Sequence, residues 1–152
     1  MSKYFVNQIA DGNMTVIAET DALQTAIVSF HTTCKNLWND ADTSKAIVEL
    51  VDDNFSVVSG YGDDTYTEYD GFREVIDKDN ATVEGNIFVE TVMNGSILSD
   101  KITEWGNVKG AMVDYHGKLA SYWNAQDVAK ARVKILNDNL DVFNGKSELV
   151  KH

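Results

Sequence analysis

The chain contains an internal repeat, and this feature constrains its fold more than any other. Residues 37–60 align with residues 122–145 without a gap, at an offset of 85. Across the longer windows 31–60 and 116–145, eleven of thirty positions are identical, whereas unrelated segments share roughly two at ordinary residue frequencies. Phe5-Val6 and Ile9 near the start of the chain also correspond to Phe88-Val89 and Val92, at an offset of 83. We therefore interpret the chain as a tandem duplication.

Each copy is predicted to form a ββαββ unit, so the fold class is α+β. An apolar stripe with three- and four-residue spacing predicts one helix from Leu23 to Trp38 and its counterpart from Val108 to Trp123. Asp11-Gly12 is a typical hairpin turn. β-Branched and aromatic residues predict strands before and after each helix. The strands expected from this pattern include 3–9, 13–19, 45–51 and 55–59 in the first copy, and 130–136 and 140–144 in the second.

The sequence also predicts how the helices begin and how the copies associate. Asp21 followed by Gln24 resembles a capping box, and Gly106 or Asn107 is placed to cap the second helix. A unit of about 65 residues is marginally stable alone. We therefore expect the two copies to pack together as an intramolecular pseudo-dimer. The expected division is a first repeat at 1–60, a connector at 61–85 and a second repeat at 86–152.

Composition limits the classes of function. The chain has 24 acidic and 13 basic side chains, a formal net charge of −11, which argues against binding nucleic acid directly or an anionic membrane. An apolar content of 43% is too high for a disordered chain. Its single cysteine, Cys34, cannot form an internal disulfide and fits a reducing compartment, so we expect a cytoplasmic protein.

The connector combines acidic residues with tyrosines, and the spacing of Phe72, Val75 and Ile76 predicts a short helix at 71–78. One interpretation is a solvated linker with docked aromatics. Another is a recognition surface that competes for a basic groove on another protein. A calcium loop starting at Asp77 lacks the required Gly and Glu, so we expect no metal. The candidate partner-binding residues are Tyr61, Asp63, Asp64, Tyr66, Glu68, Tyr69 and Asp70.

His31 and His116 occupy equivalent positions in the two helices. Cys34 lies one turn from His31, but Leu119 replaces it in the second copy, so a Cys–His nucleophile would exist only once. The simpler interpretation is a partly buried histidine bonded to a nearby carbonyl. One cysteine and two helix histidines are too few for a zinc site, which leaves a symmetric His pair across an interface as the open alternative.

A further set of repeated and basic residues suggests a small-ligand site between the copies, for example for a nucleotide. The structural explanation is that Trp closes the core while Asn ends the helix. The basic residues alternate along one strand, which places them on one face of the sheet. The candidate ligand-binding residues are His31, Trp38, Asn39, His116, Trp123, Asn124, Lys130, Arg132 and Lys134.

These observations favour a non-enzymatic, acidic protein-binding module that needs no cofactor. Its expected partner is another protein with a basic surface, and by analogy it would inhibit or modulate a nucleic-acid-handling protein, as viral or mobile-element proteins do. Two alternatives remain at this stage. One is a structural component that forms homo-oligomers or part of a virion through its edge strands, and the other is the small-ligand binder.

Overall fold

A computed structural model describes residues 3–59, 71–94, 98–125, 127–128 and 130–152. It contains two ββαββ units, which confirms the predicted duplication. The first unit contributes β1 (Tyr4–Ala10), β2 (Asn13–Thr20), α1 (Leu23–Asn39), β3 (Lys45–Asp52) and β4 (Arg73–Asp77). The second contributes β5 (Ile87–Asn94), β6 (Leu98–Trp105), α2 (Val108–Asn124), β7 (Lys130–Leu136) and β8 (Val142–Lys151).

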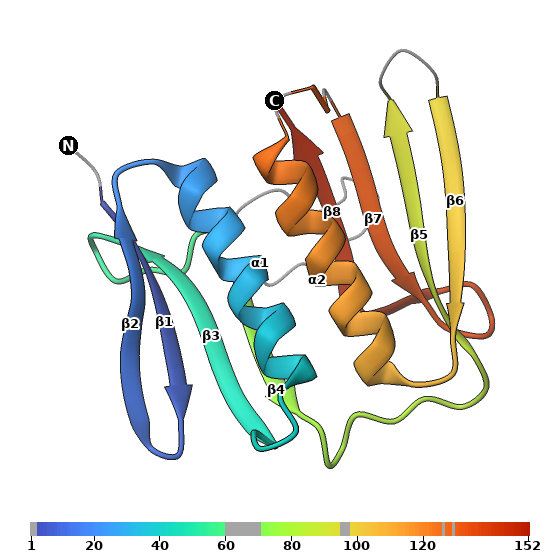
Figure 1. The fold of residues 1–152 in the computed structure, drawn as a ribbon, viewed down its shortest axis with the longest axis horizontal. Helices are drawn as coiled ribbons and strands as arrows, with labels where there is room; N and C mark the ends of the chain where they lie inside the picture. The colour runs from blue at the N-terminus through green and yellow to red at the C-terminus, as the bar shows by residue number, and fades with distance from the viewer. Residues whose placement is uncertain (1–2, 60–70, 95–97, 126, 129) are drawn as a thin grey trace.

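The strands form two separate antiparallel sheets with the same topology. Sheet A has the order β2-β1-β3-β4, and sheet B has the order β6-β5-β7-β8. The two helices lie side by side and run in opposite directions, and each packs against its own sheet (Figure 1). The two copies therefore associate mainly through α1 and α2, as an intramolecular pseudo-dimer. Neither described helix has the length and apolar character needed to cross a membrane.

The core lies between the helices and the sheet faces that they cover. Val6, Val48 and Leu50 of sheet A are fully buried beneath α1, and Val89 and Val133 of sheet B are fully buried beneath α2. Residues between these positions point to the opposite face, which neither described helix covers, because side chains alternate along a strand. Each sheet therefore has one core face and one open face.

The segment that follows β3 differs from the sequence prediction. Residues 71–78 do not form a helix, because Arg73–Asp77 is strand β4. Residues 55–59 do not form the fourth strand either, since only an isolated bridge joins Val51 to Val57. Burial along β4 alternates with a period of two, with Glu74 and Ile76 buried. A buried carboxylate at a core position hid this strand pattern from the sequence analysis.

A shared turn and an insertion explain how β4 reaches its position. Phe55 and its equivalent Leu140 both have positive φ, 62° and 66°, and each follows the same Asx-type turn. In the second copy the chain then enters β8 directly. In the first copy it reaches β4 later: Glu74 lies opposite Val48, just as Glu148 lies opposite Val133. The offset between equivalent residues thus falls from 85 to 74, so the first copy carries 11 more residues.

The helix N-termini give one correction and one confirmation. The N-cap of α1 is Ala22, which makes no side-chain capping bond, so the proposed Asp21 cap is wrong. Gln24 instead donates its Nε2–H to the carbonyl of Trp123 at the end of α2. Asn107 does cap α2, since its Oδ1 accepts the Gly110 N–H at 2.7 Å. The predicted Asp11-Gly12 turn is also confirmed, with positive φ at both residues.

Candidate functional site

A pair of histidines lies at the centre of the interface between the copies. His31 of α1 and His116 of α2 face each other, and their Nδ1 atoms are 2.9 Å apart. Their exposed fractions are only 1% and 2%. The expectation that each histidine is partly buried and bonded to a carbonyl is therefore wrong. The symmetric His pair that the sequence left open does occur, without a metal-ligand set: no group of three or more metal-ligating side chains is assembled among the described residues.

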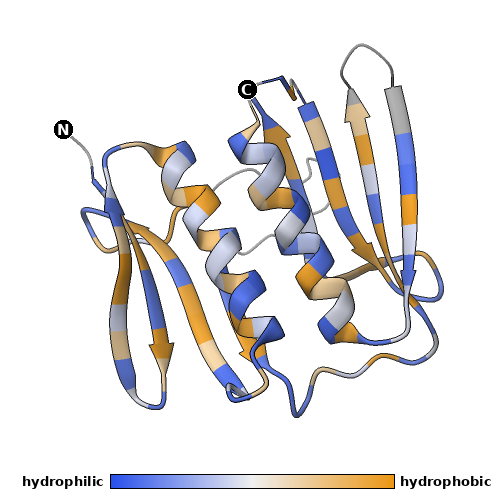
Figure 2. Cartoon of the chain, viewed as in Figure 1, coloured by the Kyte–Doolittle hydropathy of each residue, from blue (hydrophilic) through white to orange (hydrophobic). Residues whose placement is uncertain are grey.

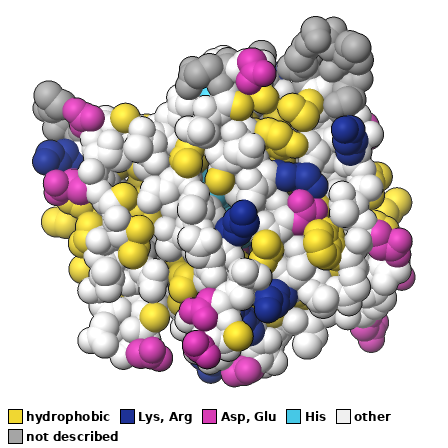
Figure 3. Space-filling view, in the orientation of Figure 1, with side chains coloured by type: hydrophobic (Ala, Val, Ile, Leu, Met, Phe, Trp, Pro, Cys, Tyr) yellow, Lys and Arg dark blue, Asp and Glu magenta, His cyan; other side chains and the backbone are white. Residues whose placement is uncertain are grey.

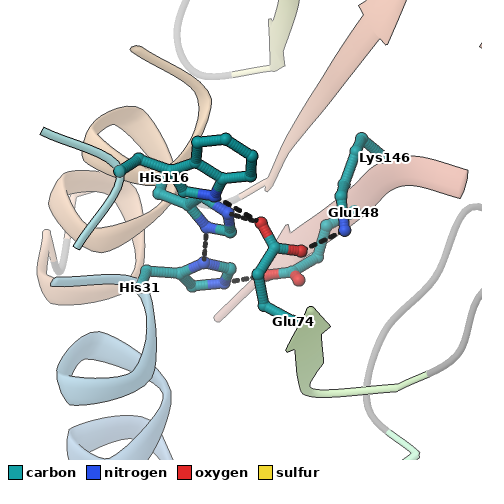
Figure 4. A network of polar contacts seen from close by, with 6 residues as sticks. His31, Glu74, His116, Lys146 and Glu148 are labelled. Carbon is teal, nitrogen blue, oxygen red and sulfur yellow. Dashed lines mark hydrogen bonds and ion pairs between the residues drawn. The ribbon is translucent and has the colours of Figure 1, made fainter. Parts of the chain in front are cut away.

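Each histidine also contacts a buried carboxylate of the other copy (Figure 4). The Nε2 of His31 is 2.7 Å from Oε2 of Glu148, and the Nε2 of His116 is 2.7 Å from Oε2 of Glu74. These contacts cross between the copies in both directions. The row Glu148–His31–His116–Glu74 is therefore continuous, and we call it the buried row.

Two tryptophans complete the buried row within their own copies. Trp38 Nε1–H donates to Oε2 of Glu74 at 3.0 Å, and Trp123 Nε1–H donates to Oε2 of Glu148 at 2.8 Å. Each carboxylate thus receives an indole from its own copy and an imidazole from the other. A buried carboxylate is costly unless charges and donors compensate it, and this arrangement supplies both from the two halves.

Among the described residues, a lysine distinguishes the Glu74 end of the buried row from the Glu148 end. Lys146 of β8 forms an ion pair with Oε1 of Glu74. By the offset of 74 that relates β4 to β8, the residue equivalent to Lys146 is Phe72, which is fully buried. Burial alone raises the pKa of Glu74, but Lys146 and His116 outweigh it and hold that pKa below its usual range. Glu74 is therefore ionised at neutral pH.

Three neighbouring titratable groups, His116, Cys34 and Tyr115, stay neutral. Burial lowers the pKa of His116, and the charges of His31 and Lys146 lower it further against the opposing effect of Glu74. Burial raises the pKa of the Cys34 thiol and of the Tyr115 hydroxyl, and the two carboxylates add to both shifts. A neutral, buried Cys34 is a poor nucleophile.

Access to the buried row is narrow. A cavity of about 30 Å³ adjoins both histidines and both carboxylates and reaches Asn144 and Gly145, which is room for about one water molecule. On the helix side of the molecule, histidine atoms are almost entirely covered (Figure 3). The cavity leaves the polar atoms of the row room for a water molecule but not for a larger group.

The structure divides the predicted ligand-binding residues into three places. His31, His116, Trp38 and Trp123 meet in the buried row. The two asparagines, Asn39 and Asn124, are exposed at the C-terminal ends of the helices. The basic residues Lys130, Arg132 and Lys134 share one face of β7, as predicted, but it is the open face of sheet B, since Ala131 and Val133 between them are buried. These nine residues therefore do not line one pocket.

The predicted partner-binding residues lie outside the described residues. This applies to the whole set, Tyr61, Asp63, Asp64, Tyr66, Glu68, Tyr69 and Asp70.

Sequence analysis missed the residues that complete the buried row. Glu74 was assigned to the connector, and neither Glu148 nor Lys146 was singled out. A search that allowed the offset to change would have aligned Glu-Val-Ile-Asp at 74–77 with Glu-Leu-Val-Lys at 148–151. That alignment places a carboxylate at the same position of each fourth strand.

The open face of sheet A is the second candidate site. Its centre is a row of four apolar side chains, one from each strand, defined by the pairs Met14–Ile9, Ile9–Ile47 and Ile47–Val75. We call these residues the apolar row. Met14 and Val75, at its ends, are 63% and 55% exposed. Val16, 52% exposed, extends the patch along the edge strand β2, where hydrophobic atoms reach the left margin of the molecule (Figure 3).

Neither a protein-family model, nor a curated protein, nor a solved structure matches this chain.

Proposed function

We propose that this protein is a non-enzymatic protein-binding module and that its partner docks on the open face of sheet A. The observation that carries this proposal is the apolar row, which crosses all four strands without a charged residue. Contiguous exposed apolar surface on a folded domain is typical of an interaction site. Burying it would contribute about 25 cal/mol per Å² of apolar area.

The second sheet supports this assignment because it lacks the feature. The residues equivalent to the apolar row on sheet B are Asp100, Val92, Arg132 and Leu149. A sheet of the same topology thus forms with opposite charges at two of these four positions. The apolar residues of sheet A are not needed to build the fold, which supports a role in binding.

The charge distribution indicates the chemistry of the partner. Residues 1–59, which carry most of the open face of sheet A, have eight acidic and three basic side chains, a net of −5. The turns at the two ends of this face, after β1 and after β3, include Asp11 and Asp53. A complementary surface has an apolar centre surrounded by Lys and Arg, and opposite charges at the rim accelerate association and favour one orientation.

The buried row supports the non-enzymatic part of the proposal. The side chains with acid–base chemistry, two histidines and two glutamates, are each 2% exposed or less. A general acid or base must come within hydrogen-bond distance of its substrate. These groups already bond one another and join the two copies.

Site-specific photo-crosslinking in cells that naturally contain this protein tests the proposal. A photo-reactive amino acid is placed at Val75 of the apolar row or, as a matched control, at Ile102 on the open face of sheet B; the two side chains are equally exposed, at 55% and 56%. We expect Val75 to give one discrete adduct with a basic protein and Ile102 to give none.

Each other outcome contradicts the proposal. No adduct, or the same adduct from both positions, would mean that the face of sheet A is not a specific docking site. An adduct with twice the mass of this chain would assign the face to self-association, which is the structural alternative.

A cleft along β4 favours a second candidate function, the binding of a small anion. This cleft, of about 270 Å³, is lined by apolar residues that include Trp38, by the basic side chains of Arg73 and Lys146, and by one carboxylate, Asp77. Apolar walls with a few polar groups are typical of ligand sites. A thermal-shift screen with nucleotides and small carboxylates tests this candidate, and a rise in melting temperature that Arg73→Ala removes would support it.

A further inference from the structure

We propose that the buried row binds one extra proton, in addition to the single ring N–H proton that each neutral histidine carries. This extra proton holds the two copies together, and its positive charge is on His31. The proposal concerns the interface between α1 and α2 and does not depend on the docking face.

The proton count follows from the contacts. The row contains three short contacts, Glu148–His31 at 2.7 Å, His31–His116 at 2.9 Å and His116–Glu74 at 2.7 Å. Each joins two atoms that bear lone pairs, so each needs one hydrogen to be attractive. Two neutral imidazoles supply two N–H groups. The third hydrogen is a proton taken from water, and it makes one ring a cation.

The tryptophans indicate that this proton is on a ring and not on a carboxyl group. The oxygen of Glu148 that faces His31 also accepts the Trp123 N–H, and the oxygen of Glu74 that faces His116 also accepts the Trp38 N–H. Two donors on one oxygen stabilise the ionised carboxylate. Both glutamates are therefore negative, and the proton stays on the histidine pair.

Lys146 determines which ring carries the charge. It forms an ion pair with Glu74, the carboxylate that His116 contacts, so its positive charge lies at the His116 end of the row. Like charges repel, and the cation is favoured at the far ring, His31. Lys146 then compensates Glu74, and His31 compensates Glu148. The two carboxylates and the two cations sum to zero charge.

The other groups around the pair are compatible with this count. From α1 and α2 the pair faces Cys34 and Tyr115, which burial keeps neutral. From β4 it faces Glu74, with Arg73 at the adjoining cavity, and from β8 it faces Lys146 and Glu148. The Arg73 side chain is 43% exposed and lies 3.6 Å from Glu49, so water screens its charge.

A change of one proton in either direction weakens the interface. A second added proton, on His116, places two N–H groups head to head across 2.9 Å. Loss of the shared proton leaves two lone pairs facing each other at the same distance. Both arrangements repel, so contact between α1 and α2 is tightest at intermediate pH.

Nitrogen-15 NMR of the full-length protein, labelled at histidine, tests the proton count directly at pH 7. We expect His31 to show two protonated ring nitrogens, and His116 to show one protonated nitrogen, Nε2, and one bare nitrogen, Nδ1. His152, which is exposed, serves as an internal reference. A bare nitrogen on both His31 and His116 would overturn the proposal, and the measurement needs no variant.

Lys146→Met tests why the charge is on His31. Without Lys146 the positive charge that disfavours a cation on His116 is gone, so we expect the proton to be shared more evenly and the ring signals of His31 and His116 to move toward each other. Lys118→Met is the matched control, because Lys118 is a partly buried lysine that pairs with Asp114 outside the row; it should leave the signals unchanged. An unchanged pattern in Lys146→Met would overturn the assignment to His31.

The pH dependence of stability gives the last test. We expect the urea midpoint of the wild type to fall on both sides of an intermediate maximum. A midpoint that falls with acid alone, and does not fall between neutral and mildly alkaline pH, would contradict a proton held between the rings.

Discussion

The open faces of the two sheets differ, whereas the faces that pack against the helices are alike. Beneath the helices, Val48 and Glu74 of sheet A correspond to Val133 and Glu148 of sheet B. On the open side, Ile47 corresponds to Arg132. Hydropathy follows the same division, since β3 is hydrophobic over most of its length and β7 alternates with hydrophilic residues (Figure 2). The shared side is what the fold requires, and the differing side is free to serve a function.

Removing a carboxylate of the buried row should produce the largest effect and reveal the inequality of its two ends. We expect Glu74→Ala to lower the free energy of unfolding by about 3–5 kcal/mol, because it leaves buried donors without an acceptor. Glu148→Ala should cost less, since the Lys146 ion pair with Glu74 survives. Urea unfolding of both variants measures the difference. Equal losses would mean that the two ends are equivalent.

Acidification should act on the same row with a smaller effect. The folded-state pKa values of Glu74 and His116 are lowered, so the unfolded chain binds more protons than the folded chain. Stability from both groups is therefore present above their unfolded pKa values and is lost as pH falls, first for His116 below about 6.5 and then for Glu74 below about 4.3. Urea midpoints between pH 7 and 4 measure this loss. A midpoint that does not move over this range would contradict the prediction.

Exchanging residues between the open faces should separate binding from folding. Ile47→Arg gives sheet A the residue of sheet B, and we expect at least a tenfold loss of partner affinity, about 1.4 kcal/mol. The free energy of unfolding should change by less than the free energy of binding, because Ile47 is only half-buried. Arg132→Ile is the matched control on sheet B and should leave affinity unchanged. Titration calorimetry with the purified partner that photo-crosslinking identifies measures the affinity of both variants. Similar losses in the two variants would remove the functional distinction between the sheets.

The helix N-termini offer the smallest contrast. Asn107→Ala removes the capping bond of α2 and should lower the free energy of unfolding by about 1 kcal/mol. Asp21→Ala in the first copy should be nearly neutral, because Asp21 is not the cap of α1. Thermal unfolding compares the two. A larger loss for Asp21→Ala would contradict the assigned start of α1.

The sequence predicts the architecture well because the repeat reports the same pattern twice. Both helices, the strands before them and the third strand of each unit follow from apolar periodicity. β4 could not be predicted in the same way, because Glu74 places a carboxylate where the pattern requires an apolar residue.

The candidate site was only half predictable. His31 and His116 stand out as a repeated pair at one offset, while Glu74 and Glu148 are related by a different offset, after an insertion of 11 residues. The exchange of partners between copies is a property of three-dimensional packing. No local pattern around Trp38 or Trp123 specifies which carboxylate its indole reaches.

Joining the copies in one chain has a chemical consequence at the row's uneven end. In an assembly of two identical subunits, a lysine at this position would appear at both ends of the row, or at neither. A single polypeptide can place Lys146 at one end and Phe72 at the other. Fusion of the halves thus permits a polarity along the interface that strict twofold symmetry forbids.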